Sequence, residues 1–141
     1  MTRRRFSLIF GILFLLFGIA GFVPQLMHRM HPEFPPLALD AGAGELLALF
    51  PVNVLLSVIH ILFGLCGLIA SRRAWAAKVY ARGVGVACIV LALAGFIPGL
   101  LNGFGLVPLY SNNIWLHGIL GLIASYFGWL RRDPVPAIVT V

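Results

Sequence analysis

The sequence predicts an all-α integral membrane protein, an up-down bundle of four helices built from two parallel-related helical hairpins. Three observations lead to this prediction. Of the 141 residues, 61% are hydrophobic and only 10% are charged, with a mean hydropathy of +1.04. That composition leaves too little polar surface to cover a soluble domain. The apolar residues fall into four long runs, and the first two runs are repeated, with variation, by the last two.

The four apolar runs have the length needed to cross a bilayer and lie at about residues 6–27, 46–70, 83–101 and 114–130. A helix rises about 1.5 Å per residue and the hydrocarbon core is about 30 Å thick, so about 20 residues suffice for one crossing. The other segments are an outer loop at 28–45, an inner loop at 71–82 and a cytoplasmic tail at 131–141. We therefore expect one membrane domain over residues 1–141.

The distribution of basic residues predicts the orientation. Nine of the ten lie in three places, at Arg3, Arg4 and Arg5, at Arg72, Arg73, Lys78 and Arg82, and at Arg131 and Arg132. Lys and Arg gather in cytoplasmic segments, so both termini and the inner loop are expected inside. The net charge of +6 then reflects topology. It indicates no nucleic-acid partner, and anionic lipid headgroups are the expected neighbours of these clusters.

An internal repeat divides the chain into two hairpins. Residues 11–26 read GILFLLFGIAGFVPQL and residues 85–100 read GVACIVLALAGFIPGL, with the motif AGFxP in common. The second and fourth runs align more weakly, at the pairs Pro51 and Pro108, His60 and His117, and Gly64 and Gly121. Because both hairpins start inside, the repeat is parallel, with its axis along the membrane normal.

The outer loop is rich in proline and glycine, which predicts an irregular segment with a short interfacial helix at 45–50. Its stretch MHRMHPEF brings His28, His31 and Glu33 close in sequence. No helix fixes these side chains, so we expect no metal site there. Cys66 and Cys88 lie within apolar runs and are expected to be small packing residues.

His60 and His117 are the main candidate site residues. Ser57, His60, Gly64 and Gly67 follow one another at spacings of three and four, so they share one face of a helix. Small residues let membrane helices approach closely, which makes this the packing face. His117 and Gly121 repeat the pattern on the fourth run. Both imidazoles are therefore expected inside the bundle, at similar depth and on diagonal helices.

Three interpretations of the two histidines stay open. In the first, which we prefer, each neutral imidazole hydrogen-bonds a backbone carbonyl, a Ser or an Asn on a neighbouring helix, with Asn112 among the candidates. No cofactor is then expected. In the second, both histidines ligate a haem b iron. In the third, a single histidine ligates a chlorophyll-type pigment or relays protons. The expected packing and polar network consists of Asn53, Ser57, Gly64, Gly67, Asn113 and Gly121.

The sequence holds no nucleophile elbow, no phosphate-binding loop, no zinc-type cysteine spacing and no carboxylate inside an apolar run. We therefore expect a small non-enzymatic membrane protein, a structural or accessory subunit of a larger membrane complex or a homo-oligomer. The alternative is a b-type haem- or chlorophyll-binding membrane subunit with His60 and His117 as axial ligands.

Several motifs together resemble a known family. These are RRRF before a helix ending in AGFVP, then LFPVN followed by a histidine and a glycine, and finally NNIWLHGILGLIASYFG. The chain resembles, over nearly its whole length, the bacterial membrane family named domain of unknown function 4383. The resemblance implies a four-helix protein of the bacterial inner (plasma) or thylakoid membrane, without an assigned activity. Members often carry a His and an Asn just before the first membrane histidine, where this chain has Leu56 and Ser57.

Overall fold

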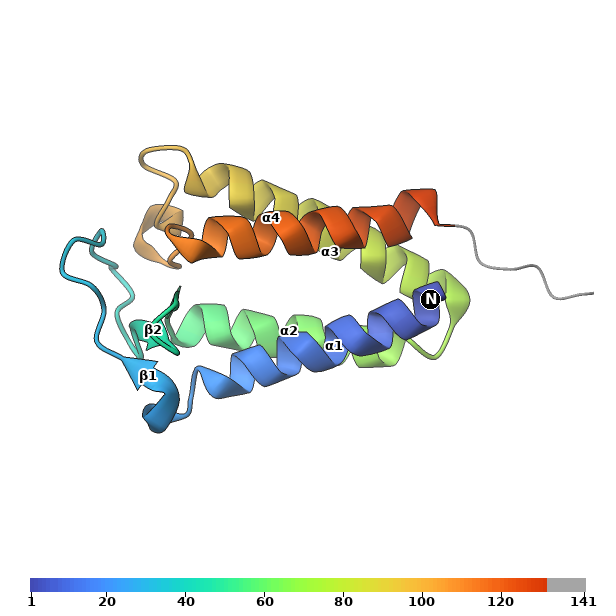
Figure 1. Cartoon of the computed structure of the whole chain (residues 1–141), viewed down its shortest axis with the longest axis horizontal. Helices are drawn as coiled ribbons and strands as arrows, with labels where there is room; N and C mark the ends of the chain where they lie inside the picture. The colour runs from blue at the N-terminus through green and yellow to red at the C-terminus, as the bar shows by residue number, and fades with distance from the viewer. Residues whose placement is uncertain (132–141) are drawn as a thin grey trace, which may run out of the picture.

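The computed structural model describes residues 1–131 and is mainly helical, with four long helices that run up, down, up and down (Figure 1). The helices are α1 (Arg3–Ala20), α2 (Val54–Ala70), α3 (Ala74–Gly95) and α4 (Asn112–Ser125), and a π-helix (Tyr126–Leu130) continues α4. The expected all-α class is thus confirmed in its main feature. Of the tail expected at 131–141, everything after Arg131 lies outside the described residues.

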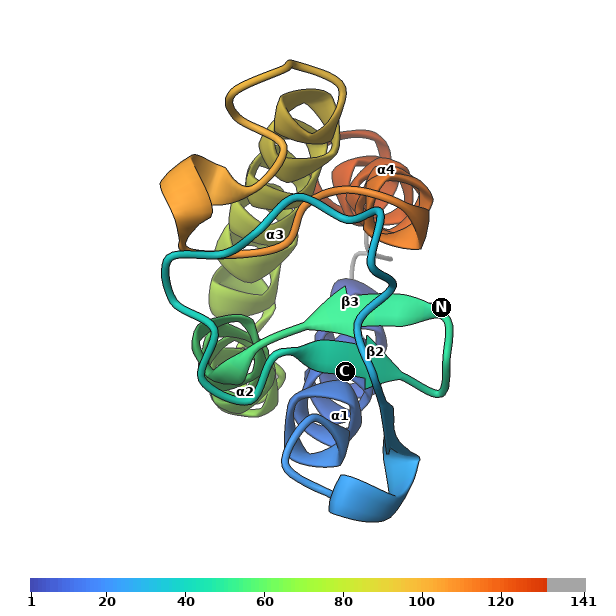
Figure 2. The same cartoon turned by 90° about the vertical axis from the view of Figure 1, so that its left-hand side faces the viewer.

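The bundle has two unlike ends. One, here called the arginine end, carries residues 1–5, the turn at 71–73 and residue 131 (Figure 1). The other, here called the sheet end, carries three short strands and the loops between residues 21–53 and 96–111. Seen from the sheet end, α1 and α2 form one hairpin beside a second formed by α3 and α4 (Figure 2).

Glycines bring the two helices of each hairpin into close contact. A Cβ atom placed on Gly11 of α1 would lie 2.8 Å from the backbone nitrogen of Leu68 and 2.9 Å from the carbonyl oxygen of Gly64. One placed on Gly121 of α4 would lie 2.9 Å from the backbone nitrogen of Ile89 on α3. Backbone atoms cannot move aside as a side chain can, so only glycine allows these helix pairs to pack this closely.

The sheet end contains a three-stranded antiparallel sheet that the sequence did not predict. Its strands are β1 (Met27–His28), β2 (Gly44–Leu46) and β3 (Phe50–Val52), in the order β1-β2-β3. The prediction of a short helix at 45–50 is therefore wrong. Leu47 and Ala48 adopt positive φ and form the turn between β2 and β3, so this apolar stretch folds back on itself.

Helix boundaries differ from the expected runs for local reasons. The second helix begins at Val54, not near residue 46, because the Asn53 side chain accepts a hydrogen bond from the Leu56 amide and caps the helix. The inner loop is only a three-residue turn, since α3 begins at Ala74 and includes the charged Lys78 and Arg82. The first helix ends at Ala20, seven residues earlier than expected.

Length and composition single out one described helix. Among residues 1–131, α3 alone has at least 18 residues and an apolar composition sufficient to cross a membrane. Helix α2 is apolar but has 17 residues. The 18 residues of α1 begin with three arginines, and α4 is 14 residues long before its π-helical extension.

The interior holds two apolar clusters. The larger one lies toward the arginine end, where Phe6 stacks on Phe127 with ring centroids 4.7 Å apart and joins α1 to the end of α4. The smaller one lies at the sheet end, around Leu46, Val52 and Leu56. The candidate histidines lie between these two clusters.

Candidate functional site

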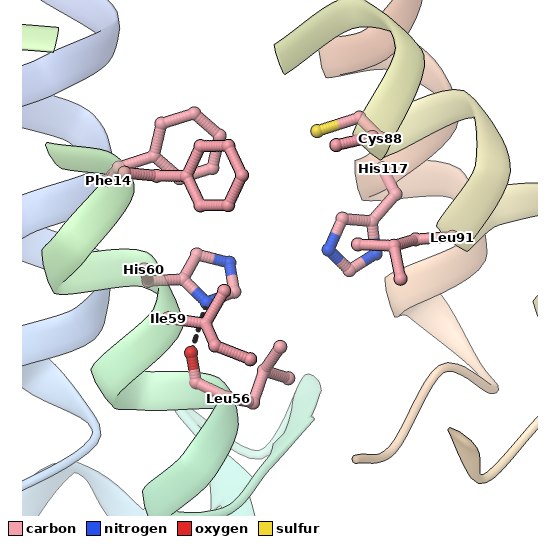
Figure 3. Close-up of a pocket in the computed structure, with 9 residues that line it drawn as sticks. Phe14, Leu56, Ile59, His60, Cys88, Leu91 and His117 are labelled. Carbon is pink, nitrogen blue, oxygen red and sulfur yellow. Dashed lines mark hydrogen bonds between the residues drawn. The ribbon is translucent and has the colours of Figure 1, made fainter. Parts of the chain in front are cut away.

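The candidate site is a pair of buried histidines that face each other across the bundle. His60 projects from α2 and His117 from α4, and their side chains point toward one another (Figure 3). The ring centroids are 6.1 Å apart and the ring planes are inclined by 37°. His60 is 4% exposed and His117 is 2% exposed. The structure thus brings together two side chains that lie 57 residues apart in the sequence.

Each ring is held by a carbonyl of its own helix. Nδ1 of His60 lies 2.7 Å from the carbonyl oxygen of Leu56, and Nδ1 of His117 lies 2.8 Å from that of Asn113. A carbonyl oxygen only accepts hydrogen bonds, so Nδ1 carries the proton in both rings and Nε2 is left as an acceptor. The expected partner on a neighbouring helix is thus replaced by the residue four positions earlier on the same helix.

Phenylalanine rings of α1 pack beside His60. The ring of Phe14 lies 5.5 Å from that of His60, and the ring of Phe17 lies 5.0 Å from it. Phe63 in turn packs 6.0 Å from Phe14. The sequence analysis did not identify these residues, although the spacing of Phe10, Phe14 and Phe17 along one face of α1 was a visible signal.

The asparagines expected near the histidines bind loop carbonyls instead. The Asn53 amide donates to the carbonyls of Leu39 and Leu106, at 2.9 and 2.6 Å. Asn113 donates to two proline carbonyls and Asn112 donates to the carbonyl of Leu49. Ser57 is buried, and its Oγ makes no hydrogen bond within the described part of the chain. No side chain of this set reaches an imidazole nitrogen.

The glycines of the expected network lie within the hairpins. Gly64 and Gly67 both pack against Gly11 of α1, and Gly121 packs against Ile89 of α3. Their contacts therefore join α1 to α2 and α3 to α4. The contact between His60 and His117 joins one hairpin to the other.

Little space separates the two rings. The cavity beside them is about 20 Å³ and is lined by Phe14, Leu56, Ile59, His60, Phe63, Ala87, Cys88, Leu91 and His117 (Figure 3). That is room for about one water molecule. A second, apolar pocket of about 160 Å³ between α1 and α4 also has His60 in its wall.

The fit of a haem or chlorophyll depends on this space. A histidine that ligates a metal usually donates its Nδ1–H to a carbonyl and binds the metal through the lone pair of Nε2. Both rings here have that protonation state. A macrocycle, however, is many times larger than one water molecule and does not fit between the rings as they stand. Ligation of one group by both histidines requires the hairpins to move apart.

Other candidate ligands do not gather into a metal site. Within residues 1–131, no three His, Cys, Asp or Glu side chains lie close enough together to hold a metal ion. In the loop, Glu45 accepts a hydrogen bond from the backbone amide of His31 at 2.7 Å. Cys66 is exposed and Cys88 is buried, and both are free thiols.

Comparison with known proteins places the chain in a family. The family described as Domain of unknown function (DUF4383) matches residues 4–130. No curated protein and no solved structure matches the chain. The match extends from the first turn of α1 to the end of the π-helix and so covers all four helices, and the protein belongs to the DUF4383 family.

Proposed function

We propose that this protein is a small, non-enzymatic integral membrane protein whose four helices all cross the bilayer. The supporting observation is its inverted polarity. The exposed apolar side chains include Leu13, Leu16, Leu62, Leu65, Val86, Val90, Ile119 and Leu122. The buried polar side chains are Ser7, Asn53, Ser57, His60, Asn113 and His117. Such an arrangement is costly in water, where large exposed apolar surfaces associate, and favourable in lipid.

Helix length is compatible with four spans. The 17 residues of α2 rise about 26 Å at 1.5 Å per residue, close to the hydrocarbon thickness of about 30 Å. The arginines of α1 occupy its first turn, where their side chains reach the headgroups. The π-helix extends α4 as far as Leu130.

Charge supports the proposed orientation. The arginine end carries Arg3, Arg4, Arg5, Arg72, Arg73 and Arg131. The described acidic residues, Glu33, Asp40 and Glu45, belong to the loop and strand of the sheet end. The arginine end then faces the cytoplasm, with both termini, and the sheet end faces outward. The family resemblance makes the bacterial inner (plasma) membrane or the thylakoid membrane the proposed location.

Matching contacts support the proposal that the two hairpins are parallel repeats. A Cβ on Gly64 would lie 2.7 Å from the backbone nitrogen of Leu15, and a Cβ on Gly121 would lie 2.9 Å from that of Ile89. Leu15 and Ile89 occupy equivalent positions in the sequence repeat, and so do the two glycines. The two hairpins therefore use the same close approach.

The proposed role is that of a structural or accessory subunit in a larger membrane complex or a homo-oligomer. Most buried polar side chains on the described helices bind backbone carbonyls, and His60 and His117 also face each other. The hydroxyls of Ser57 and Tyr80 make no hydrogen bond within the described residues. This set stabilises the bundle and provides no activated nucleophile or acid–base pair. The exterior is apolar along all four helices, so neighbouring helices can pack on it as readily as lipid can.

The test is purification from membranes in a mild detergent, with mass spectrometry of the proteins that co-purify and an absorption spectrum of the sample. We expect the protein to resist alkaline extraction, to co-purify with a larger complex or as an oligomer, and to be colourless. Release by alkali would contradict the membrane proposal. A Soret or chlorophyll band that disappears in His60→Ala would support the haem or pigment alternative.

A further inference from the structure

The opposed Nε2 atoms of His60 and His117 have no hydrogen-bond partner among residues 1–131. Both Nδ1 atoms donate to carbonyls, so both Nε2 atoms are acceptors. In Figure 3 the nitrogen of His60 that is not bonded to Leu56 faces the ring of His117. Two acceptors cannot bond each other. Neither ring makes another hydrogen bond within residues 1–131.

The separation of the rings fits one intervening group. With centroids 6.1 Å apart and ring planes inclined by 37°, the rings do not form a parallel face-to-face stack, and the gap between them is too short for a chain of bridging molecules. The adjoining cavity of about 20 Å³ has both histidines in its wall. A buried water needs at least about 10–15 Å³ and two or more polar partners, and this cavity meets both conditions.

The walls of the cavity favour a neutral occupant. Besides the two histidines, they consist of aromatic and aliphatic side chains and the thiol of Cys88. No carboxylate lines this cavity. A metal cation or an extra proton would therefore be a buried charge without a counter-ion, which is strongly unfavourable.

We propose that the cavity binds one water molecule, which donates one hydrogen to Nε2 of His60 and the other to Nε2 of His117. The site is thus a two-point acceptor for a small neutral molecule with two hydrogen-bond donors. The bridge joins α2 to α4, and therefore one hairpin to the other, midway along the helices. This inference uses only the geometry of the pair and does not depend on the membrane placement.

The first test is an experimental structure that resolves ordered water, together with ¹⁵N NMR of histidine-labelled protein. We expect a density peak within hydrogen-bond distance of both Nε2 atoms, and both rings protonated at Nδ1. Metal analysis of the same sample should give less than stoichiometric copper or zinc. A dry cavity, a stoichiometric metal, or an Nε2–H that bonds directly to the other ring would each overturn the proposal.

The second test is a double-mutant cycle with His60→Leu, His117→Leu and the double variant. If a shared water couples the two rings, the double variant loses less stability than the two single variants combined, by about tenfold in the folding equilibrium constant. His28→Leu, in β1 at the sheet end, is the control and should combine additively with either variant. Additive effects of His60→Leu and His117→Leu would overturn the bridge even if each variant folds poorly.

Discussion

The two ends of the bundle hold the hairpins together by different chemistry. At the sheet end, side-chain amides cross between the hairpins, where Asn113 donates to the carbonyl of Pro51 at 2.6 Å and Asn102 donates to that of Pro36 at 3.3 Å. At the arginine end, the crossing groups are guanidiniums. Arg3 Nε donates to the carbonyl of Phe127 at 2.8 Å, and Arg3 also bonds the carbonyl of Arg131.

The difference teaches where each end can be disturbed. Salt has little effect on the strength of a buried hydrogen bond between a neutral side-chain amide and a carbonyl, and removing the amide leaves that carbonyl without its partner. The arginines instead contact the last carbonyls of a helix, where a positive charge is favourable but partly screened by salt. Arg4 makes a similar contact with the carbonyl of Ser71 at the end of α2. The sheet end should therefore be strong and insensitive to ions, and the arginine end weaker and salt-dependent.

The largest effect is expected where the two helices of a hairpin pack closely. Both ends of the bundle depend on that packing, so its loss should destabilise them together. Gly121→Leu forces a side chain into backbone 2.9 Å away on α3 and should lower the free energy of unfolding by about 3 kcal/mol or more. Gly83→Ala is the matched control. Nothing lies within 4 Å of its Cβ position, so stability should stay unchanged or rise by about 1 kcal/mol. Unfolding in detergent followed by circular dichroism measures both; equal stability of the two variants would contradict close hairpin packing.

The next effect sharpens the account of the sheet end. Asn113→Leu removes two buried hydrogen bonds, to Pro51 at 2.6 Å and to Pro108 at 2.8 Å. We expect a loss of about 2–4 kcal/mol, because each carbonyl is left without a partner. Asn112→Leu removes a single exposed bond, to Leu49, and should cost about 1 kcal/mol or less. The difference between the two should not change with salt concentration, and a strong salt dependence would argue against buried amide bonds.

A smaller effect is expected at the arginine end. Arg3→Gln removes the guanidinium contacts with the end of α4 and should cost about 1 kcal/mol at low ionic strength. Arg5→Gln lies in the same turn, and its side chain makes no hydrogen bond within the described residues. The free energy of unfolding of the Arg5→Gln variant should therefore stay within about 0.5 kcal/mol of that of the parent protein. If high salt leaves the Arg3→Gln effect unchanged, the electrostatic part of the comparison is wrong.

The last effect is absent at neutral pH and concerns Tyr110 at the sheet end. Burial, reinforced by the nearby negative charge of Glu45, raises the pKa of Tyr110 from 10.0 to about 12. A raised pKa means that the folded protein binds the phenol proton more tightly than the unfolded chain does, so this contribution is complete below pH 10 and is lost between pH 10 and 12. Tyr110→Phe should flatten stability over that range. A difference titration by ultraviolet absorbance against Tyr110→Phe gives the pKa, and a value near 10 would contradict the burial of the phenol.

The helices were predictable from the sequence where apolar composition decides the structure. Four runs gave four helices, and small residues spaced three and four apart placed His60 and His117 inside. Because both rings point into the bundle at a similar depth, they meet where the two hairpins face each other. Nothing in the pattern, however, fixes a side-chain torsion. The bonds from each imidazole to its own helix could therefore not be predicted.

Sequence reasoning failed at the ends for two physical reasons. The charged residues predict a loop at 71–82, yet the turn before α3 has only three residues, because alanines at 74, 76 and 77 favour helix just before Lys78. Apolar character predicts a helix from about residue 46, yet the residues before Asn53 form β2 and β3. Short apolar stretches do not distinguish strand from helix, and the pairing with β1 depends on contacts distant in sequence.

The central claim, that the two ends lie on opposite sides of a bilayer, is tested most directly by cysteine labelling. In a background with Cys66→Ala and Cys88→Ala, His31→Cys marks the sheet end and Arg73→Cys marks the arginine end. A membrane-impermeant maleimide applied to intact cells should label the protein at residue 31 and should label residue 73 only after permeabilisation. Labelling of both positions from the same side would contradict the four-span arrangement.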